Sequence, residues 1–199
     1  MKKEINIYEI LDHLQTRKAL YLGNDYNFKC LESFVTGFTI AATDQQMESS
    51  QYPSFHFFNS WIIGHLKKNF GSSFGWHWQI HNRNPTNDEN AFKEFFEFLE
   101  KFKNSEVKKK MFVINKNAEE NYLNSGVKKS RIVDGNSTPI TEVPSKIIWT
   151  TIANSKTVWY DYLDKNGNVL ESSWEINEKE LLNKFKREFG SLDINWTNL

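Results

Sequence analysis

Apolar residues recur every three or four positions through the first half of the chain, a spacing that places them on one face of an α-helix. This pattern covers four segments: residues 5–16, 28–46, 54–70 and 88–102. The last of them opens with Asp88 and Glu89, whose negative charge suits the positive end of a helix dipole. The spacing therefore predicts a bundle of about four helices.

The pattern changes after Lys103, where β-branched and aromatic residues gather in short runs that are typical of strands. The runs lie at residues 111–114, 147–152, 157–163 and 169–174. Asn166 and Gly167 lie between the last two, and an Asn-Gly pair favours the tight turn of a β-hairpin. The sheet is therefore expected to be mostly antiparallel.

One helix is predicted to follow this hairpin. Asn177 is typical of a helix N-cap, Glu180 stands in the capping-box position, and Gly190 ends the helix. Residues 192–196 are expected to form a final strand. Residues 115–144 hold few apolar side chains, which predicts a long connection with little regular structure.

These elements predict an α+β protein, with an N-terminal helical bundle of about four helices followed by a small, mostly antiparallel sheet with one C-terminal helix. The expected domains are a helical, aromatic-rich domain over residues 1–103 and an α+β domain over residues 104–199. One continuous core through both halves is the alternative.

Aromatic residues concentrate between Tyr52 and Trp78, where nine of the 27 side chains are Phe, Trp or Tyr. Such density builds either a packed core or a recognition surface. Trp76, Trp78 and Ile80 alternate with polar residues, which predicts a short strand or loop between two helices. The candidate binding residues are Trp61, Trp76, His77, Trp78 and His81. The alternative is that these rings close the base of the helical domain.

The sequence shows no assembled catalytic motif. His77 and His81 are four residues apart, but on a strand that spacing separates them by about 13 Å, too far to share a metal ion. Cys30 is the only cysteine, so an internal disulfide and a cluster of thiolate ligands are excluded. No nucleophile elbow and no phosphate-binding loop occurs. We therefore expect no catalytic residue, no metal and no cofactor.

Charge and hydropathy narrow the range of partners. The 25 Lys and Arg side chains balance 25 Asp and Glu side chains, and a nucleic-acid binder would need a basic excess. No apolar run is long enough to cross a membrane or to form a signal peptide. A single cysteine is also typical of a reducing compartment. The expected location is therefore the cytoplasm, with no membrane and no nucleic acid as partner.

The segment from Ile7 to Gly23 resembles the opening of a group of small, poorly characterised bacterial proteins. Their pattern is Arg-Pro-x-x-Tyr-Leu-Gly, which Arg17, Tyr21, Leu22 and Gly23 match, while Lys18 replaces the proline. Phe34, Gly37, Phe38, Phe58, Trp61, Gly75 and Trp76 are also similar. The resemblance covers about residues 5–103. It implies an immunity or accessory protein that accompanies an antagonistic bacterial toxin, a role that needs no catalytic residue.

The sequence thus predicts a non-catalytic cytoplasmic protein that binds another protein, and the resemblance implies an immunity protein that blocks a toxin domain. Two alternatives stay open. One is a small-ligand-binding or metal-dependent enzyme module with a pocket around the tryptophan and histidine cluster. The other is a structural homodimer whose interface uses the surplus aromatic side chains.

Overall fold

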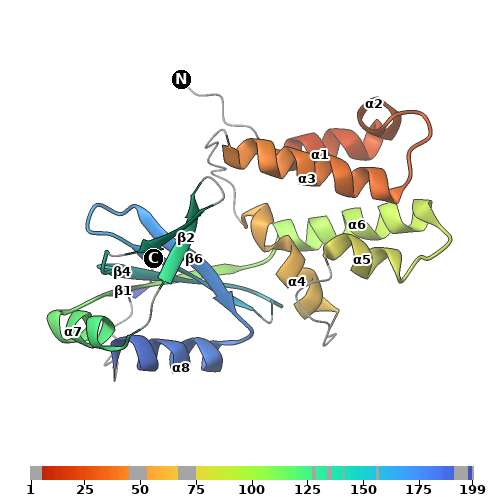
Figure 1. The fold of residues 1–199 in the computed structure, drawn as a ribbon. Coiled ribbons are helices and arrows are strands. Elements are labelled where there is room, and N and C mark those ends of the chain that lie inside the picture. The colour runs from red at the N-terminus through yellow and green to blue at the C-terminus, as the bar shows by residue number, and fades with distance from the viewer. Residues whose placement is uncertain are drawn as a thin grey trace. The chain divides into compact units, whose positions relative to one another are not determined.

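The computed structural model describes residues 6–44, 53–66, 75–126, 129–133, 136–140, 142–155, 157–190 and 197–198. The chain separates into two compact units, which we name the helical unit (residues 1–105) and the sheet unit (residues 106–199) (Figure 1). The composition change that the sequence places after Lys103 lies close to this division. Each unit is described by itself below.

The described part of the helical unit contains six α-helices and one 3₁₀ turn. They are α1 (Ile7–Thr16), α2 (Lys18–Leu22), α3 (Phe28–Asp44), η1 (Phe55–Phe57), α4 (Phe58–His65), α5 (Trp76–His81) and α6 (Asp88–Lys103). Asparagine side chains cap two of them: Asn6 accepts a hydrogen bond from the Tyr8 amide at 2.9 Å, and Asn87 accepts one from the Asn90 amide at 2.9 Å. The four predicted helices are thus present as α1, α3, η1 with α4, and α6, while α2 and α5 are additional.

Helix α5 corrects the strand predicted around Trp76, Trp78 and Ile80. The alternation of large apolar and polar residues suggested a period of two, but Gln79 and Ile80 are adjacent and both fully buried. A strand would place adjacent side chains on opposite faces, whereas one wide face of a helix can bury both. Gly75, in an extended conformation, stands directly before the first helical residue.

Phenylalanine side chains of α6 form the centre of the helical unit. Phe95 and Phe102 are fully buried, and Phe58 from α4 packs against both, with ring centroids 5.6 and 5.3 Å away. Leu11 and Leu14 of α1 are equally buried. The 3.6-residue spacing of apolar positions therefore predicted the core face of these helices correctly.

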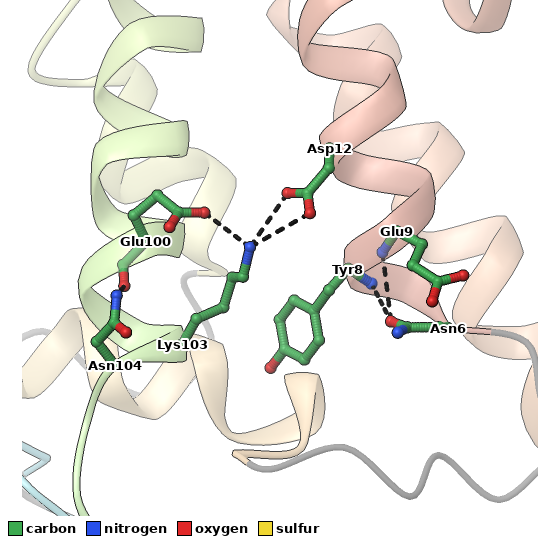
Figure 2. Close-up of polar contacts among 7 residues, drawn as sticks. All are labelled: Asn6, Tyr8, Glu9, Asp12, Glu100, Lys103 and Asn104. Carbon is green, nitrogen blue, oxygen red and sulfur yellow. Dashed lines mark hydrogen bonds and ion pairs between the residues drawn. The ribbon is translucent and has the colours of Figure 1, made fainter.

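An ion-pair cluster at the C-terminal end of α6 joins it to α1 (Figure 2). The Lys103 ammonium lies 2.8 Å from Glu100 Oε1 and 3.2 Å from Asp12 Oδ1. Partial burial of Lys103 disfavours its charged form, but the hydrogen bonds that its ammonium donates to Glu100 and Asp12 outweigh this effect and raise the pKa of Lys103. Tyr8, beside this cluster, donates its hydroxyl proton to the Pro53 carbonyl and so joins α1 to the residues that precede η1.

The sheet unit is built on a five-stranded antiparallel sheet with the order β6-β5-β4-β1-β7. Its strands are β1 (Val107–Val113), β4 (Lys146–Ile152), β5 (Val158–Leu163), β6 (Val169–Glu175) and β7 (Thr197–Asn198). A separate hairpin pairs β2 (Lys129–Val133) with β3 (Asn136–Ile140), and the helices are α7 (Lys116–Asn124) and α8 (Glu178–Phe189).

The two faces of this sheet differ. Trp149, Tyr160 and Tyr162 lie on the face that α7 and α8 cover, together with Phe185 and Phe189 of α8 (Figure 1). Because side chains alternate along a strand, Trp159 and Asp161 of β5 point to the opposite face. Trp159 pairs there with Trp174 of β6, with ring centroids 6.5 Å apart.

The predicted hairpin between β5 and β6 is present. Asp164 Oδ1 accepts hydrogen bonds from the amides of Asn166 and Asn168, and Gly167 adopts a φ of +89°, which glycine tolerates best. Asn177 caps α8 by accepting a bond from the Glu180 amide at 2.9 Å. The strand predicted at residues 192–196 lies outside the described residues.

The prediction that residues 115–144 hold little structure is wrong. This stretch contains α7, β2 and β3. Asn115 caps α7 through the Ala118 amide, and Ala118 and Tyr122 bury one face of the helix at a spacing of four. The α+β class, the order of helices before a sheet and the C-terminal helix are confirmed, while α7 is a second helix of the sheet unit. None of the described helices is both long enough and apolar enough to cross a membrane.

Replacement of Gly190 by alanine is expected to lower the free energy of unfolding of the sheet unit by about 1–2 kcal/mol. Gly190 has a φ of +81°, and an added Cβ would stand 2.4 Å from Asn121 Nδ2, which donates to the Phe189 carbonyl. Denaturant unfolding of the full chain measures the change. Gly37→Ala is the control: no atom of the described residues crowds that helical position, so a small gain in stability is expected. A Gly190→Ala protein whose free energy of unfolding equals that of the parent would contradict the prediction.

Candidate functional site

The candidate site lies on helix α5, which presents two kinds of side chain. Gln79 and Ile80 point into the helical unit and are fully buried. Trp76, His77, Trp78 and His81 are each half-buried. Four of the five predicted binding residues are thus on one short helix, with part of each ring at the surface.

Trp76 is held in place by aromatic neighbours from three other helices. Its ring packs against Phe28 of α3 at 6.0 Å, Phe95 of α6 at 4.9 Å and Phe58 of α4 at 6.1 Å between centroids. Such offset and edge-on contacts fix a ring more firmly than burial of apolar area alone. Trp76 is therefore a rigid side chain with an exposed margin.

His77 connects α5 to α3 by two kinds of contact. Its Nδ1 lies 3.1 Å from Glu32 Oε2, and its ring stacks on Phe28 with centroids 4.9 Å apart and planes 18° apart. The ring of His81, one helical turn on, lies nearly parallel with its centroid 5.8 Å away. The other nitrogen of His77, Nε2, is buried and has no hydrogen-bond partner among the residues that the structure describes.

The charge state of His77 follows from this environment. Burial lowers the pKa of His77 and is the largest influence on it. Glu32 raises the pKa, while His81 and Lys29 lower it and Asp88 raises it by smaller amounts. The net effect is a lowered pKa, so the imidazole is held neutral at pH 7.

Trp61 differs from the other predicted binding residues, because only 1 % of its surface is exposed. The expectation that it contacts a partner therefore does not agree with the structure. Trp61 stacks on His65 of the same helix at 4.6 Å and packs against Phe102 of α6 at 5.6 Å. The spacing of apolar residues predicts Trp61 on the apolar face of its helix, and its side chain is indeed buried in the core of the helical unit.

The helical form of α5 brings His77 and His81 closer than the strand prediction allowed. They share one helix face instead of standing about 13 Å apart as on a strand. No group of three or more His, Cys, Asp or Glu side chains within the described ranges could hold a metal ion. Cys30 carries a free thiol and lies on α3.

A second polar cluster lies in the sheet unit, between β5, β6 and α8. Tyr162 donates its hydroxyl proton to Glu188 Oε2 at 2.7 Å, although only 4 % of Glu188 is exposed. Lys184 Nζ lies 3.7 Å from Glu188 Oε1 and 3.5 Å from Glu175 Oε1. Sequence reasoning missed this cluster, yet Glu188 is three residues beyond Phe185 and seven beyond Leu181, on the apolar stripe of the helix.

The electrostatics of this second cluster favour a structural role. Burial, followed by the nearby Glu188 carboxylate, raises the pKa of Tyr162 far above its ordinary value. Burial opposes the charge on Lys184, but Tyr160, Glu188 and Glu175 together raise the pKa of Lys184. A tyrosine with a raised pKa is a poor base and a poor nucleophile, so the cluster ties α8 to the sheet rather than activating a reacting group.

An open groove of about 520 Å³ also lies along α6 beside α1. Its lining residues are Gln15, Lys93, Phe96, Glu97, Glu100 and Lys101. Acidic and basic groups are mixed there, and Phe96 at its floor is nearly buried. The groove therefore favours no particular ligand charge.

Comparison with known proteins identifies no relative of this chain. No family model, no curated protein and no solved structure matches the chain.

Proposed function

We propose that this protein is a non-catalytic binding protein that acts in the cytoplasm, and that it blocks a bacterial toxin domain as an immunity protein does. Its partner is a protein surface, and it works by covering that surface rather than by changing a substrate. The half-buried rings of Trp76, His77, Trp78 and His81 on α5 carry this proposal.

Half-buried aromatic side chains suit protein recognition for a physical reason. A ring that is already fixed in the free protein loses little conformational freedom when it binds, and it still brings a large apolar area to an interface. Trp76 meets this requirement through its contacts with Phe28, Phe58 and Phe95. Tryptophan is also among the residues that contribute most binding energy at interfaces.

Polar side chains beside these rings can make binding selective for one partner. His77 and Glu32 form a pair at the surface between α3 and α5, with Glu32 more exposed than His77. A partner with a donor aimed at Glu32 would gain a hydrogen bond, and a partner with a carboxylate there would be repelled. Recognition would then rest on aromatic anchors flanked by one charged group.

The test is binding to the product of the gene that neighbours the coding sequence, measured by co-purification and calorimetry. We expect a 1:1 complex with a dissociation constant on the order of nanomolar. Failure to bind that product would overturn the proposal. The small-ligand module and the homodimer stay predictions.

Trp78→Ala is expected to weaken that complex about 30-fold or more, which corresponds to about 2 kcal/mol at a central anchor. Trp78 is half-buried on α5, so its loss removes binding area with little change to the core. Trp174→Ala is the matched control, because it removes a half-buried tryptophan from the sheet unit. Equal loss of affinity in both variants, or none in Trp78→Ala, would show that α5 is not the contact surface.

A further inference from the structure

Three helices of the helical unit contribute charged groups around His77. Helix α3 contributes Glu32 and Lys29, α5 contributes His81, and α6 contributes Asp88 at its first residue. These are the charged groups that act on the imidazole from the described elements packed around it. A change in the charge of His77 would therefore alter its electrostatic interactions with side chains on all three helices.

The surroundings of His77 favour one protonation state. A neutral imidazole carries one N–H, and the negative Glu32 carboxylate 3.1 Å from Nδ1 favours that proton on Nδ1. Nε2 then bears a lone pair that faces no donor among the described residues, which is a tolerable loss for an acceptor. In this state His77 is a neutral donor stacked between Phe28 and His81.

Proton uptake changes each of these contacts. A second N–H would form at Nε2, a buried atom that has no acceptor in the described part of the chain, and burying an unpaired donor is costly. The new positive charge would stand 5.8 Å, centroid to centroid, from the ring of His81, whose electrostatic effect lowers the pKa of His77. Attraction to Glu32 and Asp88 offsets this only in part, since the pKa of His77 is lowered overall.

We propose that neutral His77 is a clamp between α3 and α5, and that its protonation in mildly acidic solution releases α5 from α3. The direction follows from linkage. A histidine whose folded-state pKa lies below the unfolded value of about 6.5 stabilises the fold fully above pH 6.5, and this contribution is lost as pH falls below it. Helix α6 has no histidine of its own, and the histidine that packs against its Phe98 at 5.4 Å is His65 of α4, which does not belong to the clamp.

Hydrogen exchange of the full chain at about pH 7.5 and about pH 5.5, corrected for intrinsic rates, tests the clamp. Amides of α5 are expected to exchange several-fold faster in acid, a larger change than in α6, which packs against His65 rather than His77 through Phe98. In the same sample, the imidazole proton signal of His77 is expected to titrate with a midpoint below 6.5. Equal protection of α5 at both values of pH would overturn the proposal.

Two variants separate a proton-dependent role from a merely structural one. His77→Phe keeps a ring against Phe28 but cannot take up a proton, so the acid response of α5 should disappear. Glu32→Gln removes the carboxylate that raises the pKa of His77, so acid should open α5 further than in the parent. His13→Gln, at an exposed position on α1, should keep the full response.

Each variant can also contradict the clamp. A full acid response in folded His77→Phe would assign the effect to another group. If that variant fails to fold, Glu32→Gln decides: an acid response equal to or smaller than that of the parent overturns the proposal. Neither result depends on whether a toxin partner exists.

Discussion

Phe95→Ala is expected to lower the free energy of unfolding of the helical unit by about 3–5 kcal/mol. Phe95 is fully buried and its ring lies between Phe28, Phe58, Trp76 and Phe96. Alanine would remove the transfer free energy of the ring and leave a cavity whose aromatic walls cannot easily collapse. Denaturant unfolding, followed by tryptophan fluorescence, measures the loss.

Leu20→Ala is the control for this prediction, because 72 % of Leu20 is exposed on α2. It should change stability by less than about 0.5 kcal/mol. The packing of Trp76 also depends on Phe95, so the variant should loosen α5 as well as α6. A loss below about 1 kcal/mol for Phe95→Ala would mean that these rings do not form a well-packed core.

Glu188→Ala is expected to destabilise the sheet unit by about 3 kcal/mol, the second largest effect. The substitution removes the carboxylate that accepts from the Tyr162 hydroxyl, and it takes one of the two described carboxylates away from Lys184, leaving Glu175 at 3.5 Å. Breaking a buried pair costs more than the pair contributes, since the remaining groups stay desolvated. Lys186→Ala, on the exposed side of α8, should be nearly neutral.

A double-mutant cycle with Tyr162→Phe isolates the bond between these two side chains. Alone, Tyr162→Phe should cost about 1 kcal/mol, because it removes one hydrogen bond to a charged acceptor. In the Glu188→Ala protein the same substitution should cost almost nothing, since its partner is already gone. Additive effects would show that the 2.7 Å contact contributes no coupling energy.

The local pattern of the chain predicted most elements, and the misses have physical causes. Helix α5 was misread because large apolar and polar residues alternate over six positions, too short a window to distinguish a period of two from one of 3.6. The outcome was decided by tertiary packing, since Phe28 and Phe95 hold Trp76 in place. Neither phenylalanine is near Trp76 in the sequence.

Helix α7 was missed for a different reason. Its buried face consists of Ala118 and Tyr122, which is too little apolar surface to stand out from the polar residues around it. The sheet unit supplies the stabilisation that the helix lacks alone, through the stacking of Tyr122 on Phe189 at 5.1 Å. The Asn115 cap was the signal that could have located it.

The sequence was enough to predict which residues make up the candidate site, but it did not reveal how their side chains are arranged. Composition pointed to Trp76, His77, Trp78 and His81, and the helix places them together. The pairing of His77 with Glu32 joins positions 45 residues apart, which no local pattern reveals. Burial of Trp61 follows from its helical face, while its stacking on His65 depends on the fold.

The connection between the two units has a consequence for affinity. Helix α6 ends at Lys103 and β1 begins at Val107, so residues 104–106 are the covalent connection between the two compact units. If one unit binds a target, the short connection keeps the other unit close to that target. Its effective concentration there is on the order of millimolar. A weak contact between the second unit and the same target would then slow dissociation of the complex. Cleavage of the connection would remove this avidity and leave the binding surface of each unit unchanged.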